Sequence, residues 1–259
     1  MPAEVLYEQK GSVAYVTLNR PDRMNALGPG IKSGLVDAFT KIRRDSSVRV
    51  AVITGAGDRA FCAGADLKER AVKQTPNVDP SMCPLDELPR SDTIVLETYK
   101  PVIAAVNGYA LAGGCELSLA CDIRIASENA VFGLTEATRG MGANFASIML
   151  QYVIPRGIAM QMLFTGEHMT AQDALRYGLV NEVVPRSDLM PRATALAEKI
   201  AINAPLSLRR MKELAIKSLG IPLAAAVRMG PGPSPYESED SIEGARAFAE
   251  KRRPVWKGR

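Results

Sequence analysis

Short apolar segments, each followed by a glycine-containing loop and then a segment of helical period, fill the first part of the chain. Alternation of apolar and polar residues over 13–20 (VAYVTLNR) predicts a strand. The apolar runs at 48–55 (VRVAVITG) and 100–108 (KPVIAAVNG) predict buried strands that end in glycine. Between the first two, residues 29–45 carry apolar positions at helical spacing. This succession of strands and helices predicts an α/β architecture.

The pattern changes after residue 146, where segments of helical period follow one another and are separated by glycine and proline. In that part, only residues 179–184 (LVNEVV) have the pattern of a strand. We therefore expect an α/β core over residues 1–190 and a C-terminal helical region over residues 191–259. The proline-rich stretch at 73–92 predicts a mobile loop.

Length and composition are those of a soluble globular protein with one large domain, or one domain and an appendage. The 259 residues hold 32 Lys plus Arg and 28 Asp plus Glu, a net charge of +4. Because the charges are dispersed, we expect no nucleic-acid partner. No apolar run approaches the ~18 residues that span a membrane, and the first ten residues lack the pattern of a targeting segment. These features favour a cytoplasmic protein without a membrane partner.

Several kinds of chemistry have little support in the sequence. The single histidine, His168, is in a polar segment, which favours a surface residue, and no G-x-S-x-G motif of a serine hydrolase is present. The stretch VITGAGDRAF (52–61) lacks the third glycine of a dinucleotide-binding loop. The four cysteines, at 62, 83, 115 and 121, form no C-x-x-C pair. They therefore predict free, buried thiols in a reducing compartment and no zinc or other metal site.

Two glycine turns remain as candidates for a site. AFCAGADL (60–67) follows a strand, turns at Gly64 and leads into a short helix, and YALAGGCELSL (109–119) does the same at Gly113 and Gly114. Small residues allow a ligand to approach the backbone, and a helix that begins there directs unpaired N–H groups outward. Two such turns side by side would offer two donors to one oxygen, an oxyanion hole that suits a thioester enolate.

Two glutamates lie close to these turns in the sequence. Glu116 falls in the first turn of the helix that follows Gly113, and Glu136 comes twenty residues later. Taken singly, Glu116 is explained by the helix macrodipole and Glu136 by helix capping. However, Leu117 and Leu119 make the first helix apolar nearly all round, which predicts that Glu116 is buried. A buried carboxylate is costly unless it is partnered or protonated, so the combination indicates a functional site.

Several segments together carry a family resemblance: NRPDRMNAL (19–27), VITGAGDRAFCAGADLKE (52–69), KPVIAAVNGYALAGGCELSLACDIRIAS (100–127), FGLTEATRG (132–140), LFTGEHMTAQDALRYGLVNEVVP (163–185) and AFAEKRRPVWKGR (247–259). This resemblance is to the crotonase, or enoyl-CoA hydratase/isomerase, superfamily and covers essentially the whole chain. It implies a spiral of ββα units with a C-terminal helical region that forms trimers, commonly paired into hexamers. It also implies an acyl-CoA substrate and no separate cofactor, because coenzyme A is part of that substrate.

The resemblance also implies roles for individual residues. The peptide N–H groups of Ala63 and Gly113 would hold the thioester oxygen, and Glu116 and Glu136 would be catalytic. The turn that holds Met24 and Ala26 would flank the adenine and phosphates, while residues 63–66 would line the acyl-CoA channel. The substrate-binding residues implied in this way are Met24, Ala26, Ala63, Gly64, Ala65, Asp66 and Gly113.

In a few places the chain departs from the family. Asp22 stands where many members have a lysine, so a phosphate contact would have to come from Arg23. The basic C-terminal tail, 251–259, either helps to bind the phosphates of coenzyme A or is a solvated end. Met141, Asn144 and Phe145 differ from the usual pattern after the second glutamate and would border the acyl pocket. The loop at 73–92 would act as a lid of variable sequence.

Retention of both glutamates favours a hydratase, a lyase of the kind found in fatty acid metabolism. Glu116 would activate water, and Glu136 would supply the α-proton for syn addition to a 2-enoyl-CoA, giving a 3-hydroxyacyl-CoA. Two alternatives stay open. One is another reaction of the same fold: thioester hydrolysis, ring cleavage or Δ3-Δ2 isomerisation. The other is a non-catalytic relative that binds acyl-CoA or RNA. The sequence leaves the acyl group undetermined.

Overall fold

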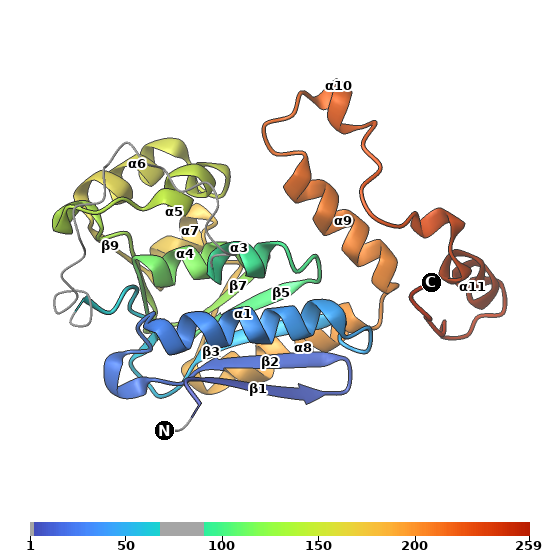
Figure 1. Ribbon diagram of the computed structural model, residues 1–259, viewed down its shortest axis with the longest axis horizontal. Coiled ribbons are helices and arrows are strands. Elements are labelled where there is room, and N and C mark those ends of the chain that lie inside the picture. Colours follow the sequence, from blue (N-terminus) through green and yellow to red (C-terminus); the bar gives the residue numbers. More distant parts are fainter. Residues whose placement is uncertain (1–2, 68–90) are drawn as a thin grey trace.

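The larger of two sheets carries the core of the molecule. The computed structural model describes residues 3–67 and 91–259 (Figure 1). Within those residues the larger sheet has the strand order β1-β2-β3-β5-β7-β10, with β1 antiparallel to β2 and the other neighbours parallel. Its strands are β1 (Val5–Lys10), β2 (Val13–Leu18), β3 (Val50–Gly55), β5 (Val102–Val106), β7 (Ile123–Ser127) and β10 (Glu182–Val184). The predicted strands are present, and the α/β prediction is confirmed.

The smaller sheet brings the functional loops together. In the described part of the chain its order is β4-β6-β8-β9, with β9 antiparallel to β8. The strands are β4 (Ala60–Cys62), β6 (Tyr109–Leu111), β8 (Val131–Gly133) and β9 (His168–Thr170). Because β4, β6 and β8 are parallel, their carboxyl ends lie at one edge, where the loops that follow them meet. His168 begins β9 instead of lying in a turn, but it is exposed, as predicted.

Helices cover both faces of the larger sheet. The helices of the described residues are α1 (Pro29–Arg44), α3 (Ser91–Leu96), α4 (Gly113–Leu119), α5 (Asn144–Met149), α6 (Arg156–Thr165), α7 (Ala171–Tyr177), α8 (Leu189–Ala201), α9 (Pro205–Lys217), α10 (Leu223–Ala226) and α11 (Glu239–Ala249). Helix α1 packs on one face of the sheet and α8 on the other. Helix α1 buries Ile31, Leu35 and Phe39 on one face, the helical spacing that the sequence predicted. Short 3-10 turns connect the elements, among them η1 (Pro21–Arg23) and η2 (Ala137–Arg139).

Helix α8 belongs to the core. Its alanines at 193, 197 and 201 are buried, together with Leu189, in a cluster that includes Val50 and Ile103 of the sheet. The predicted division between residues 190 and 191 therefore falls inside α8. The helical extension begins with α9, and Figure 1 shows α9, α10 and α11 projecting away from the two sheets.

An ion pair between the buried Lys212 and the more exposed Asp122 connects the extension to the core. Lys212 of α9 donates to Asp122 Oδ2 at 2.8 Å and to the Lys100 carbonyl at 2.9 Å. Beyond this contact, the extension presents large apolar side chains to solvent. Those with more than half of their surface exposed include Met211 66%, Leu223 77%, Val227 70%, Tyr236 86%, Ile242 63% and Phe248 88%. Exposed apolar surface of this extent is typical of an interaction face.

The described cysteines are chemically protected. Cys62, Cys115 and Cys121 are free and buried, and burial raises the pKa of each thiol to about 12. Cys83 and residues 73–90 of the expected lid loop lie outside the described residues, as does the short helix expected after Gly64, apart from Leu67. Within the described ranges, none of the helices is long and apolar enough to cross a membrane.

Candidate active site

The two glycine turns lie against each other at the carboxyl edge of the smaller sheet. A Cβ built on Gly64 would be 2.8 Å from Ala112 Cβ and 3.2 Å from the Gly113 nitrogen. A Cβ built on Gly113 would be 3.9 Å from Gly64 Cα. Gly64 also has a φ of +83°, which disfavours any side chain. The structure therefore brings the loop after β4 into contact with the start of α4, and this approach requires a glycine at position 64.

Hydrogen bonds decide which amides of the first loop are available. The Ala63 N–H donates to the Met24 carbonyl at 3.0 Å, and the Gly64 carbonyl accepts from the Leu27 N–H at 2.7 Å. The Gly64 N–H faces the Cys62 thiol. Among the described residues, the Ala65 and Gly113 N–H groups have no hydrogen-bond partner. The expected donor Ala63 is thus occupied, and Ala65 is the amide of this loop that can serve a ligand.

The turn that holds Met24 and Ala26 lies beside this loop, as these same hydrogen bonds show. Met24 and Asn25 have left-handed backbones, with φ of 51° and 54°. Asn25 tolerates this conformation, and its fully buried side chain accepts from the Arg20 N–H at 2.9 Å and donates to the Ala60 carbonyl at 2.8 Å. The substrate-binding positions expected from the resemblance are therefore assembled in one place.

Arg20 is a residue of this site that sequence reasoning missed. Its guanidinium lies 3.3 Å from Asp66 Oδ2 and 3.3 Å from Glu4 Oε1, and it donates to the Ala26 carbonyl at 3.3 Å. The side chains of Arg20 and Asp66 are largely buried. Arg20 therefore connects Glu4, which directly precedes β1, with the Met24–Ala26 turn and the end of the glycine loop.

Replacement of Arg20 by methionine is expected to destabilise the protein by about 2–4 kcal/mol, because it leaves the buried Asp66 carboxylate without this partner. Urea unfolding monitored by circular dichroism measures the change. Arg43→Met, on the exposed face of α1, is the matched control and should change stability by less than about 0.5 kcal/mol. Equal unfolding midpoints for the two variants would show that the Arg20 contacts contribute nothing.

Glu116 is held in place by the neighbouring helix. It lies in the first turn of α4 and is only 7% exposed, as the apolar pattern of that helix predicted. Its Oε1 accepts a hydrogen bond from the Ala146 N–H, in the first turn of α5, at 3.0 Å. Asn144 and Phe145 begin the same helix. The segment that departs from the family pattern therefore helps to position the Glu116 carboxylate.

Glu136 is buried in a different environment. It is 6% exposed at the start of η2, where its side chain caps no backbone group. In the described part of the chain its Oε2 atom is buried without a hydrogen-bond partner. Burial raises the pKa of Glu136, a hydrogen bond from its own amide partly offsets this, and the charge of Glu116 raises the pKa further. The two carboxyl groups thus share one site and differ in their partners, which is the arrangement that separates an acid from a base.

The cations of the basic tail are largely engaged by neighbouring acids. Arg252 pairs with Glu243 at 2.6 Å, while Lys257 and Arg259 pair with Glu239 at 2.8 and 3.1 Å. A phosphate of coenzyme A would have to compete with these ion pairs. The basic tail therefore has fewer unpaired positive charges for the expected phosphate contact than the sequence suggested.

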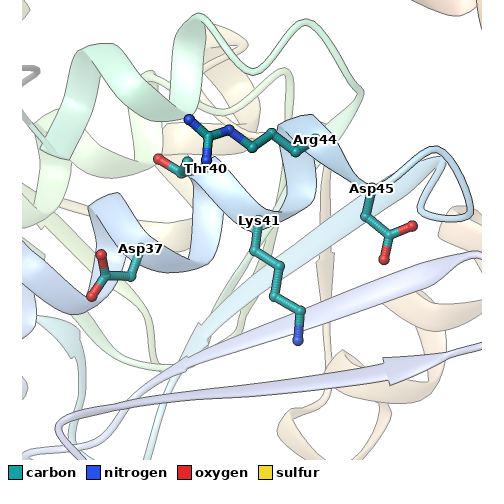
Figure 2. Close-up of a pocket in the computed structure, with 5 residues that line it drawn as sticks. All are labelled: Asp37, Thr40, Lys41, Arg44 and Asp45. Carbon is teal, nitrogen blue, oxygen red and sulfur yellow. The ribbon is translucent and has the colours of Figure 1, made fainter.

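A surface groove on α1 lies away from this site. This groove of about 470 Å³ follows the outer surface of α1, lined by Asp37, Thr40, Lys41, Arg44 and Asp45 (Figure 2). It includes none of the loop residues or glutamates. Within the described ranges, no group of three or more His, Cys, Asp or Glu is arranged to hold a metal ion.

Comparison with known proteins places the chain. Residues 8–259 match the family model described as enoyl-CoA hydratase/isomerase. The chain is 43% identical to an (E)-benzylidenesuccinyl-CoA hydratase of Thauera aromatica (98% of this chain and 99% of that protein). It is 40% identical to a carnitinyl-CoA dehydratase of Salmonella typhi, with 97% of each covered.

Solved structures agree with this result. The crystal structure of an enoyl-CoA hydratase from Mycobacterium tuberculosis H37Rv matches with a TM-score of 0.86 and 38% identity, over 99% of this chain and 100% of that one. One from Bacillus anthracis matches with a TM-score of 0.86 and 36% identity over the same shares. The predicted crotonase-like fold is therefore confirmed, and the chain belongs to the enoyl-CoA hydratase/isomerase family.

Proposed function

We propose that the protein is an enoyl-CoA hydratase that adds water to the double bond of a 2-enoyl-CoA thioester. The observation that carries this proposal is the pair of unlike buried carboxyls. Glu116 is held by a backbone amide, while Glu136 has a raised pKa and a buried oxygen that has no hydrogen-bond partner in the described part of the chain. They share their site with two N–H groups, of Ala65 and Gly113, that have no partner among the described residues.

In the reaction we propose, the thioester oxygen accepts hydrogen bonds from the N–H groups of Ala65 and Gly113. These donors stabilise the negative charge that develops as the enolate forms. Glu116 removes a proton from water while the water oxygen bonds to C3, and Glu136 gives its proton to C2. Because both carboxyls act from one side, addition is syn. The steps are acid–base steps, so the scheme requires no cofactor besides the coenzyme A of the substrate.

The named relatives support this class of reaction. One is called a hydratase and the other a dehydratase, and both names refer to CoA thioesters. The acyl groups in those names differ from simple straight chains. We therefore infer that the natural acyl group is substituted, since Asn144 and Phe145 lie in the segment that departs from the family pattern and begin the helix that holds Glu116.

The test is to incubate the purified protein with crotonyl-CoA, with aryl enoyl-CoAs and with enoyl-CoAs that carry a second carboxylate. Loss of the conjugated thioester absorbance, with a product heavier by one water in mass spectrometry, supports the proposal. Release of free thiol would indicate a thioester hydrolase. A product of unchanged mass with a shifted double bond would indicate an isomerase. Either result would replace the hydratase assignment.

We also propose that the helical extension associates with other copies of the chain, as a trimer or a pair of trimers. The exposed apolar side chains of α9–α11 support this, because a monomer gains nothing from leaving them in water. Phe248→Asp, at an 88% exposed position, should shift the protein toward monomers. Sedimentation velocity measures this, and Glu128→Gln on the core surface is the control. An unchanged sedimentation coefficient would remove this face from the interface.

A further inference from the structure

Ala112 has a backbone conformation that a residue with a side chain rarely adopts. Its φ is 50° and its ψ is −127°, in a region that glycine enters easily and alanine does not. The residue is the N-cap of α4 and directly precedes the Gly113 amide. Strained backbone that persists in a folded protein is held by its surroundings and gathers at functional sites.

Two hydrogen bonds and one packing contact hold Ala112 in this conformation. Its N–H donates to the Gly133 carbonyl of β8 at 2.7 Å, and its carbonyl accepts from the Glu116 N–H at 3.0 Å. Its methyl group lies over Gly64, where a built Cβ would come within 2.8 Å of it. The glycine at position 64 thus makes room for the methyl group at position 112, and the two glycine loops touch through that methyl group.

We propose that Ala112 is a positioning residue for the pair of amide donors. Its methyl group, packed on Gly64, sets the separation and direction of the Ala65 and Gly113 N–H groups. This inference rests on the proposed function of those amides. The packing of this methyl group on Gly64 then explains why alanine occupies a position whose backbone suits glycine. A glycine at position 112 would relieve the strain but would leave the two loops free to shift.

The test is Ala112→Gly. Its melting temperature should equal or exceed that of the parent, because the strain is relieved. Its kcat with the best enoyl-CoA substrate should fall about tenfold while KM changes less than about twofold, because preorganised donors act on the charge of the transition state. Ala204→Gly is the matched control: this residue is also a helix N-cap, of α9, but has a relaxed φ of −60°. It should leave kcat unchanged.

A second readout reports on the donors directly. In a Glu136→Gln background, which slows turnover, cinnamoyl-CoA bound in the site should absorb at longer wavelength as its carbonyl is polarised. Adding Ala112→Gly should reduce this red shift. If kcat and the red shift both match the parent, or if only KM changes, the inference is wrong. If the parent protein hydrates no enoyl-CoA, the proposed function fails instead, and the red shift still tests the position of the amides.

Discussion

Glu136→Gln is expected to lower turnover by about 100-fold or more, because Glu136 supplies the α-proton in the proposed mechanism. The same change should make the protein more stable at neutral pH. Glutamine is neutral at every pH, whereas burial without a hydrogen bond to Oε2 in the described structure disfavours the charged form of the wild-type carboxyl, which becomes more populated as pH rises. Steady-state kinetics and urea unfolding on one preparation measure both effects.

The direction of the pH dependence follows from the raised pKa of Glu136. Between its ordinary value of 4.5 and the raised value, the folded protein binds more protons at this site than the unfolded chain does. The stabilising contribution of the protonated carboxyl is therefore complete below 4.5 and is lost as pH rises through the raised value. Glu136→Gln should not show this loss, so the stability difference between variant and parent should grow with pH.

Glu128→Gln is the control for both measurements, since Glu128 is exposed. It should change neither turnover nor the pH dependence of stability. Wild-type turnover in Glu136→Gln would remove Glu136 from the mechanism. A variant that is inactive and also less stable at every pH would indicate a structural role for this carboxyl in place of an acid–base role.

Arg124→Met is expected to cause the largest loss of stability, about 3–5 kcal/mol, because it leaves buried carbonyl groups without a donor. Arg124 is buried, and its guanidinium donates to the Leu179 carbonyl at 2.6 Å, to Cys121 at 2.7 Å and to Ser118 at 3.2 Å. The Ser118 carbonyl belongs to the last turn of α4, the helix that begins at Gly113, and the Cys121 carbonyl directly follows the C-cap of that helix. The arginine therefore secures the far end of the helix that carries Glu116.

Urea unfolding of Arg124→Met against Arg156→Met tests this prediction, since Arg156 is exposed at the start of α6. The control should unfold with the parent. Similar midpoints for both variants would mean that the carbonyls find other donors. The activity of Arg124→Met should fall only in proportion to the fraction of protein that is unfolded. The protein that remains folded should keep the parent KM.

Sequence patterns identified the strands in which nearly every position has the same buried environment. The strands at residues 50–55 and 102–106 are buried on both faces, so their apolar runs identified them. Helix α8 was placed outside the core because its buried positions are mostly alanines, such as Ala193 and Ala197, in a period shared with the helices after it. Helical period shows which face is apolar but does not show which surface covers that face.

For the site, the sequence indicated the side chains whose chemical type suits acid–base catalysis, but it did not indicate which main-chain donor is available. Glu116 is buried, as its apolar helix predicted, and Glu136 is buried too, although the sequence around it predicted only helix capping. The donor in the first loop was assigned to Ala63, but the Met24 carbonyl, from a turn nearly forty residues earlier, occupies that N–H. The ion pair between Arg20 and Asp66 likewise joins residues 46 positions apart. Such partners are set by tertiary contacts, which local sequence patterns do not encode.

The contact between the two glycine loops has a consequence for mutational surveys. Half of the proposed machinery is main chain, and truncating side chains to alanine leaves every peptide N–H in place. An alanine scan would therefore report Glu116 and Glu136 but would leave Ala65 unchanged, and at Gly113 it would add a methyl group without removing the N–H. Only changes that add bulk or alter torsion angles, at positions such as Gly64, would reveal that the backbone takes part.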